Sequence, residues 1–244
     1  MATAKIAHVA RRDTPCPGTR VLELVADEPL GFIGGQYIIV DSGLLLPSGK
    51  AAKRAYSICS SDAEQRRFEL AVKQLPGGVV SGFLHDLALG AEVRFSGPWG
   101  KLGPTEGAPD STTNGATVIL ATDTGISAAL GLIQAARMQP LLASTTLIWL
   151  QVDGERFLPE AELRARLPAG CAVQLAALPP IGHPERVPHA RAVLAAALSP
   201  AVVRGYLAGD GAVNYALLDD LIAAGIAATR DSVESFFNMP KKSA

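Results

Sequence analysis

The stretch Arg54-Ala55-Tyr56-Ser57 places a cation, an aromatic ring and a hydroxyl within four residues. Side chains alternate along a strand, so Arg54 and Tyr56 would share one face while Ser57 points to the other. A flavin nucleotide needs these three groups: a partner for its phosphates, a flat apolar cover for its ring, and a hydrogen bond at the ring edge. An ordinary strand with one exposed arginine would show the same pattern, so the surrounding sequence must decide between a flavin-binding strand and an ordinary one.

The first half of the chain has the pattern of short strands separated by turns. Strands are expected at residues 5–12, 20–25, 36–41, 54–58, 68–73 and 92–95. Many short strands with glycine and proline turns are typical of a sandwich or a barrel. One helix is expected at 80–87, because Val80, Phe83, Leu84 and Leu87 have helical spacing after the Gly77-Gly78 turn.

The second half alternates strands with helices. Residues 102–115 are rich in Gly, Pro, Ser and Thr, as in a linker, and residues 117–122 form an apolar run typical of a buried parallel strand. Further strands are expected at 146–151, 172–177 and 204–208. Helices are expected at 127–138, with Ser127 as N-cap, and at 159–167, 190–198 and 213–224. This alternation predicts a doubly wound parallel sheet.

Composition excludes several classes of function. The 244 residues suffice for one large or two modest domains, and a net charge of −1 gives no basic surface for nucleic acid or an anionic membrane. No apolar run approaches the roughly 20 residues of a membrane span. Cys16, Cys59 and Cys171 lack C-x-x-C spacing, so we expect no metal site and no four-thiolate iron–sulfur cluster. A reduced, cytoplasmic setting is expected.

Two turns precede expected helices and could bind anions. Pro76-Gly77-Gly78-Val79-Val80-Ser81 offers backbone N–H groups at a helix N-terminus, where the helix dipole favours negative charge. Thr122-Asp123-Thr124-Gly125-Ile126-Ser127 follows the first parallel strand, at the edge where open α/β sheets bind ligands. Each turn alone is also compatible with a routine connection.

Two later segments add to this set. Tyr206-Leu207-Ala208-Gly209-Asp210-Gly211-Ala212 joins a strand to a helix through a glycine-flanked turn. Glu234-Ser235-Phe236-Phe237-Asn238 carries two adjacent aromatic rings close to the end of the sequence. Such a tail either docks as a strand of the core or covers a cofactor face.

In this order, the segments resemble the ferredoxin–NADP reductase superfamily. The resemblance covers residues 32–237, with F-x-x-G-Q-Y at 32–37, R-x-Y-S at 54–57, a pyrophosphate loop at 77–81 and Gly-Pro-Trp-Gly at 97–100. The family implies an N-terminal six-stranded antiparallel β-barrel that binds FAD, expected here at residues 1–103. It implies a following α/β doubly wound nucleotide-binding domain, expected at residues 114–244, that presents NADH or NADPH to the flavin.

The resemblance also assigns roles to single residues. Tyr56 would lie against the isoalloxazine, and Ser57 would hydrogen-bond near flavin N5, the atom that accepts hydride. Phe236 or Phe237 would approach the opposite face of the ring. The full set of expected cofactor-binding residues is Arg54, Tyr56, Ser57, Gly77, Gly78, Val79, Val80, Ser81, Thr124, Gly125, Gly209, Asp210, Phe236 and Phe237.

The nicotinamide half departs from the family's pattern. Thr122 and Asp123 replace glycines of the usual G-G-T-G-I-x-P turn, and Ala208 replaces the cysteine of a Cys-Gly-Pro turn. A carboxylate about 4 Å from a pyrophosphate costs on the order of 4 kcal/mol at an effective dielectric constant of about 20. Asp123 would avoid that cost by pointing away or by binding a ribose hydroxyl.

Three functions stay open from the sequence. The first is a FAD-dependent NAD(P)H reductase that passes electrons singly to a separate ferredoxin, flavodoxin or oxygenase component. The second is a flavin-binding subunit of a larger complex with a degraded nicotinamide site, acting as an electron relay or structural partner. The third is a reductase of free flavin, which the loop at 77–81 disfavours. Asp153 would repel a 2′-phosphate and so favours NADH as the substrate, while Arg156 and Arg191 could bind that phosphate and leave NADPH possible.

Overall fold

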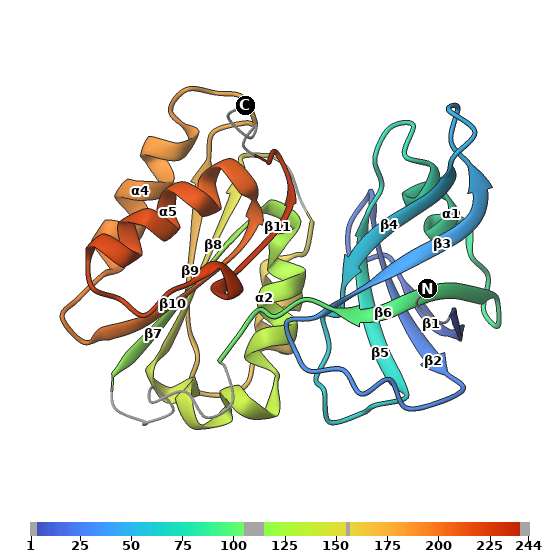
Figure 1. The fold of residues 1–244 in the computed structure, drawn as a ribbon, viewed down its shortest axis with the longest axis horizontal. Helices are drawn as coiled ribbons and strands as arrows, with labels where there is room; N and C mark the ends of the chain where they lie inside the picture. Colours follow the sequence, from blue (N-terminus) through green and yellow to red (C-terminus); the bar gives the residue numbers. More distant parts are fainter. Residues whose placement is uncertain (1–3, 105–114, 155–156, 240–244) are drawn as a thin grey trace.

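The computed structural model describes residues 4–104, 115–154 and 157–239, which form two sheets with helices packed against them (Figure 1). The first sheet is built from strands of the N-terminal half, with one helix before its last strand. These elements are β1 (Lys5–Asp13), β2 (Thr19–Ala26), β3 (Tyr37–Leu45), β4 (Ala51–Ser57), β5 (Arg67–Lys73), α1 (Val79–Asp86) and β6 (Glu92–Trp99).

The first sheet is a six-stranded antiparallel barrel, as predicted. Its order is β4-β3-β6-β1-β2-β5, and an antiparallel bridge between Ile58 and Leu70 joins the two ends of that order. Its interior is filled by alternate residues of the strands, including Phe68 and Phe95, whose rings meet edge to face at 5.7 Å. Helix α1 packs against β3, β4 and β5, so it closes one end of the barrel.

The second sheet is parallel, in the order β11-β10-β7-β8-β9, which confirms the predicted doubly wound α/β class. The order reverses between β7 and β10, so this edge is the topological switch point. Its strands are β7 (Ala116–Thr122), β8 (Thr145–Val152), β9 (Ala172–Leu178), β10 (Val202–Asp210) and β11 (Val233–Phe237). The helices are η2 (Asp123–Gly125), α2 (Ile126–Ile133), η3 (Ala136–Ser144), α3 (Glu160–Arg166), α4 (Arg186–Ala197), α5 (Gly211–Ala223) and η4 (Arg230–Ser232).

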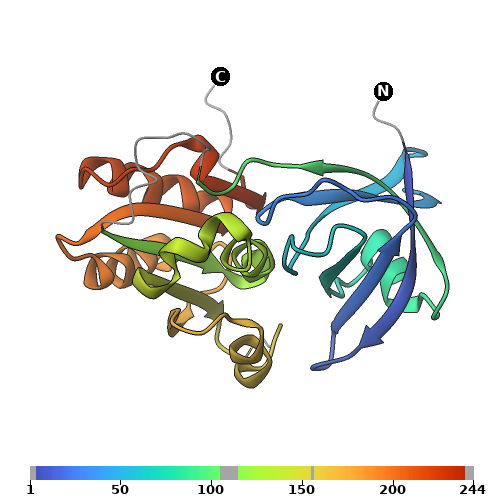
Figure 2. The same ribbon diagram turned by 90° about the horizontal axis from the view of Figure 1, so that it is seen from below.

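Alternate residues of each strand point to opposite faces of this sheet, and each face carries its own hydrophobic core. Ile119 and Trp149 pack with α2 and α3, whereas Leu120 and Ile148 pack with α4 and α5. Helix α2 therefore lies between the sheet and the barrel, and α4 and α5 cover the other face (Figure 1). The view from below in Figure 2 shows the barrel and the α/β half next to each other with α2 at their junction.

Two helices differ from the sequence prediction. The helix expected at 127–138 ends at Ile133, because Ala135 is extended and Pro140 lies in a separate 3-10 segment. Ser127 is not its N-cap, since η2 already begins the helical turn at Asp123 and places Ser127 inside α2. Helix α4 begins at Arg186 rather than at 190, because a proline, Pro188, is tolerated in a first turn.

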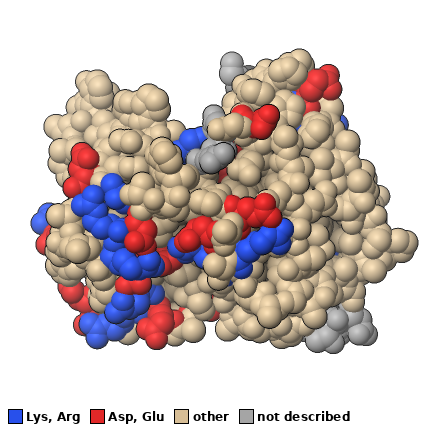
Figure 3. All heavy atoms as spheres, turned by 180° about the vertical axis from the view of Figure 1, so that it is seen from behind, with Lys and Arg blue, Asp and Glu red and all other residues tan. Residues whose placement is uncertain are grey.

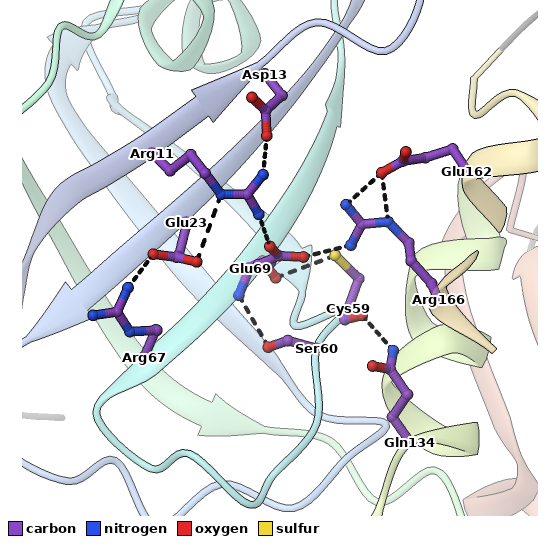
Figure 4. A network of polar contacts seen from close by, with 10 residues as sticks. All are labelled: Arg11, Asp13, Glu23, Cys59, Ser60, Arg67, Glu69, Gln134, Glu162 and Arg166. Carbon is purple, nitrogen blue, oxygen red and sulfur yellow. Dashed lines mark hydrogen bonds and ion pairs between the residues drawn. The ribbon is translucent and has the colours of Figure 1, made fainter. Parts of the chain in front are cut away.

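The junction between the two halves is close and polar. A side chain on Gly131 of α2 would overlap the carbonyl of Ile58, and one on Gly34 would overlap the carbonyl of Gly131. Glu69 of β5 accepts hydrogen bonds from Arg11 of the barrel and from Arg166 of α3 (Figure 4). Charged side chains of both signs form a band over the rear of the molecule (Figure 3). These contacts fix how the α/β half faces the barrel.

Candidate functional site

The R-x-Y-S motif lies on β4, at one end of the barrel's strand order. Tyr56 pairs with Ile38 and Ser57 with Tyr37, so Tyr56 and Ser57 point to opposite faces. Ser57 is buried, whereas Arg54 is exposed. Burial raises the pKa of Tyr56 to about 12, and the charge of Arg54 opposes that rise. The Arg54 guanidinium therefore lies close enough to the Tyr56 hydroxyl to affect its pKa, as expected for two side chains on the same face of a strand.

The glycine turn at the barrel end leads directly into α1. Gly77 has φ 68°, the N-cap Gly78 provides no side-chain cap, and the first turn holds no acidic residue. The Ser81 hydroxyl donates to the carbonyl of Gly78 at 3.1 Å and accepts from the N–H of Leu75 at 3.2 Å. Ser81 thus stabilises the turn through two hydrogen bonds to its backbone. The N–H groups at the start of α1 remain available to an anion, which the helix dipole favours.

A cavity of about 620 Å³ lies beside this turn. Its volume is in the range of about 300–1,000 Å³ that is usual for small-molecule sites. Tyr56, Val79 and Phe83 border the barrel core nearby, and α1 contacts β4, so motif, turn and cavity share one end of the barrel. The cavity is lined by Leu44, Gln74, Leu75, Gly77, Gly78, Val79, Gly82, Phe83, Asp86 and Leu87.

The second predicted set meets at the switch point between β7 and β10. A side chain on Gly125 would overlap the carbonyl of Ala208, so the two loops touch through their backbones. Gly209 has φ 121° and lies against Thr122, whose hydroxyl accepts from the N–H of Asp210 at 2.8 Å. The structure therefore brings the turn after β7 and the end of β10 together.

An arginine that the sequence did not indicate fills this switch point. Arg186 of α4 is buried, its Nε donates to Asp210 at 2.7 Å, and its Nη2 pairs with Asp123. Asp123 therefore points toward an internal cation, one of the two ways in which it avoids facing a bare pyrophosphate. The neighbouring Thr124 borders a space of only about 10 Å³, shared with Lys73, Asp123, Gln151 and Phe157.

The aromatic tail is strand β11, parallel to β10. Ser235 accepts a hydrogen bond from Asn214 of α5 at 3.1 Å. The register then shifts, since Gly209 pairs with Ser235 and Asp210 with Phe237. Phe236 packs against the core cluster that contains α2 and is therefore directed toward the helix that lies next to the barrel.

Glu234 of β11 lies where the tail meets the barrel. A methyl group added to Gly100 would lie 3.0 Å from Glu234 Oε2 and 3.1 Å from the Tyr37 ring. Burial raises the pKa of Glu234 to about 7, and burial together with the Glu234 charge raises the pKa of Tyr37. Within the described ranges, no cation pairs with Glu234. Because Tyr37 pairs with Ser57, this carboxyl lies close to the predicted flavin edge.

Sequence reasoning missed the roles of Arg186 and Glu234, for different reasons. Arg186 lies in the first turn of α4, where the helix dipole disfavours a cation. A prediction that began this helix at residue 186 would have shown an arginine at an unfavourable position, and so a reason to expect an acidic partner for it. Glu234 is only a neighbour of the two phenylalanines in the sequence, because the burial of a carboxylate is not visible there. Arg156, expected to keep NADPH open, lies outside the described residues.

Two negative findings concern only the described part of the chain. No group of His, Cys, Asp and Glu there is placed to hold a metal ion. The same residues include no helix whose length and apolar character would let it cross a membrane.

Residues 8–103 match the protein family described as the oxidoreductase FAD-binding domain. The chain is 35% identical over 136 residues to the reductase subunit of an aromatic O-demethylase from Amycolatopsis, covering 54% of this chain and 36% of that protein. It is 38% identical over 104 residues to ferredoxin–NADP reductase B of Sorangium cellulosum, covering 43% and 39%. Residues 8–103 thus have the sequence pattern of an oxidoreductase FAD-binding domain, and the chain is similar to reductases of the ferredoxin–NADP reductase type.

Two solved structures share the fold across nearly the whole chain. A cytochrome P450 reductase from Amycolatopsis has a TM-score of 0.71 at 22% identity, covering 98% of this chain and 70% of that one. The ferredoxin reductase in carbazole 1,9a-dioxygenase has a TM-score of 0.73 at 22% identity, covering 96% and 69%. The chain spans little more than a third of the length of the curated relatives described above.

Proposed function

We propose that this chain binds FAD at the barrel end that carries α1. The supporting observation is that an uncapped helix N-terminus after Gly77-Gly78, the Arg54–Tyr56 strand and a cavity of about 620 Å³ lie at one place. These features fit the cofactor, since the N–H groups of Val79 to Ser81 suit its pyrophosphate and the cavity suits its nucleotide part. The match of residues 8–103 to a FAD-binding domain supports the same proposal.

The proposed activity is that of a FAD-dependent NAD(P)H oxidoreductase with a separate redox protein as electron acceptor. Relatives named as a reductase subunit, a reductase component and a ferredoxin–NADP reductase support this class. When bound, FAD supplies the chemistry of accepting a hydride and releasing its two electrons one at a time. A ferredoxin, flavodoxin or oxygenase component is the proposed acceptor.

The chain's own residues would orient the ring and manage a proton. Arg54 would neutralise phosphate charge, Tyr56 would lie against the isoalloxazine, and the Ser57 hydroxyl would bond at its edge. Phe236 is the proposed cover of the opposite face, in preference to Phe237, because it packs against the core cluster that contains α2. Glu234, with a pKa of about 7, can hold a proton near neutral pH and release it without a large penalty.

Thr124, Gly125, Gly209 and Asp210 remain the proposed contacts of the nicotinamide nucleotide. Asp153, exposed just after β8, supports NADH over NADPH in this proposal, because it would repel a 2′-phosphate. A cytoplasmic location is proposed as well, supported by Cys16, Cys59 and Cys171 all being free.

A second function deserves testing because of one observation. Arg186 and its two carboxylates occupy the switch point, which favours a flavin-binding subunit that relays electrons within a complex without taking hydride from a nicotinamide. A reductase of free flavin is disfavoured, since the turn and cavity at the barrel end support retained FAD.

The absorbance spectrum of the purified protein, before and after NADH under anaerobic conditions, tests these functions together. A yellow protein that NADH or NADPH bleaches supports the NAD(P)H oxidoreductase. A yellow protein indifferent to both supports the relay subunit. A colourless protein that oxidises NADH only with added flavin would support the free-flavin reductase and contradict the proposed FAD site.

A further inference from the structure

Arg186 has all of its nitrogen atoms engaged at the switch point. Nε donates to Asp210 at 2.7 Å, Nη2 pairs with Asp123, and Nη1 donates to the carbonyl of Pro179. A guanidinium has a planar fork that binds carboxylates and phosphates in the same way. The fork of Arg186 is thus an anion-binding group that two carboxylates of the chain already occupy.

The two carboxylates differ in how firmly they are held. Asp210 is fully buried, caps α5 by accepting from the N–H of Ala212 at 2.9 Å, and accepts from Asn238 Nδ2 at both oxygens. These bonds hold the Asp210 carboxylate in place independently of the arginine. Asp210 is therefore a fixed anchor that holds Arg186 at the switch point.

Asp123 is the partner that can leave. Its side chain keeps 11% exposure, against 0% for Asp210, and borders the small space beside Thr124. Its backbone has φ 49°, a left-handed conformation that costs a non-glycine residue energy and persists only where other contacts impose it. Two hydrogen bonds impose it here. Trp149 Nε1 donates to the Asp123 carbonyl at 2.9 Å, and the N–H of Val152 donates to the Asp123 carboxylate at 3.3 Å.

Charge and space both oppose a dinucleotide at this place while Asp123 stays. Two carboxylates face one guanidinium, so the phosphates of a nucleotide that approaches Arg186 would meet the like charge of Asp123. The adjoining space of about 10 Å³ has room for one water molecule and none for a diphosphate. Ligands of open α/β sheets nevertheless bind at the switch point.

We propose that Asp123 is an internal competitor of the pyridine nucleotide: its carboxylate holds the face of Arg186 that would otherwise bind the nucleotide's pyrophosphate. The nucleotide binds by displacing Asp123 while Asp210 keeps Arg186 in place. This inference rests on the proposed NAD(P)H oxidoreductase function and adds the residue that sets nucleotide affinity.

Asp123→Asn is the decisive variant. Asparagine accepts the left-handed backbone at least as readily as aspartate, and its amide oxygen can still accept from Val152. Its amide nitrogen then faces Arg186 and cannot accept from it, so the substitution removes both the charge and the bond that occupies the guanidinium. The matched control is Asp220→Asn, because Asp220 of α5 pairs at 2.8 Å, on the surface, with Arg191 of α4, the helix that carries Arg186. The probes are NAD⁺, NADP⁺ and inorganic pyrophosphate, which need no turnover.

The dissociation constants of these probes are measured by calorimetry on the full chain. Asp123→Asn is expected to lower the constant for NAD⁺ or NADP⁺, and that for pyrophosphate, at least tenfold, while Asp220→Asn leaves them unchanged. Adding Arg186→Lys, which keeps the charge and removes the fork, is expected to cancel most of that gain. Unchanged constants in Asp123→Asn, or a gain that survives Arg186→Lys, would overturn the proposal.

The same preparations separate this proposal from the proposed function. A wild-type protein that NADH bleaches, with probe affinities unaltered in Asp123→Asn, keeps the function and refutes the competitor. A wild-type protein that NADH does not bleach, with a tenfold gain of binding in Asp123→Asn, supports the competitor and refutes the function as a nicotinamide reductase.

Discussion

The barrel end and the switch point both place a glycine-containing turn before a helix, yet only one of them is open. At the barrel end, α1 begins without a side-chain cap beside a cavity of about 620 Å³. At the switch point, Asp123 and Asp210 enclose a buried arginine and leave about 10 Å³. A turn motif therefore predicts where an anion could bind, whereas residues far from the motif determine whether the place is free.

The largest expected effect tests whether the buried charges are structural. Arg186→Met removes the only cation that the described structure places against both Asp123 and Asp210, so it should destabilise the fold by about 3–5 kcal/mol. Arg191→Met, on the surface of the same helix, should cost less than about 1 kcal/mol. Urea denaturation measures both, and equal losses would remove the contrast between an internal and a surface ion pair.

The second prediction concerns Glu234, where the two regions meet. Its folded pKa of about 7 exceeds its ordinary value of 4.5, so the folded state binds more protons between these values and stability falls as pH rises through this window. Glu234→Gln should abolish that fall and be more stable above pH 7 by up to about 3 kcal/mol. Urea unfolding at pH 5 and pH 8 measures the difference, with the exposed Glu160→Gln as control.

A parallel pH response in wild type and Glu234→Gln would show that this carboxyl titrates normally. That result would also withdraw its proposed part in holding a proton beside the flavin.

The third prediction tests the open region. Arg54→Ala should weaken FAD binding by about ten- to a hundredfold, because a charge-assisted bond to phosphate contributes about 1.5–3 kcal/mol. Lys53→Ala is the matched control, since Lys53 pairs with Asp41 and lies one residue away on the other face of β4. Retention of flavin on a desalting column is measured, and equal retention in the two variants would assign Arg54 the wrong role.

The smallest effect is expected at Ser57. Ser57→Ala should keep FAD bound and slow its reduction by NADH about three- to tenfold, the loss of one hydrogen bond at the ring edge. Stopped-flow absorbance gives this rate. A variant as fast as wild type would leave the buried hydroxyl with a packing role alone.

The strands of the barrel and the alternation of the second half were predictable, because hydrophobic period and turn residues act locally. The residues 117–122 form β7 almost as expected, and the apolar spacing of Val80, Phe83 and Leu84 marks α1. The ion cluster was not predictable, since its members lie on three segments that only the fold brings together. Asp123 stood out as an anomaly in its motif, but nothing local pointed to Arg186.

Helix α2 meets the barrel through Gly131, with no room for a single methyl group between its backbone and the turn at Gly34 or the carbonyl of Ile58. Side chains at an interface can change rotamer when the partner domain is replaced, but two main chains in direct contact cannot adjust in this way. A chimera that joins this barrel to the α/β half of a structurally similar reductase should therefore assemble only if the donor also carries glycine at that helical position, whatever its active-site residues are.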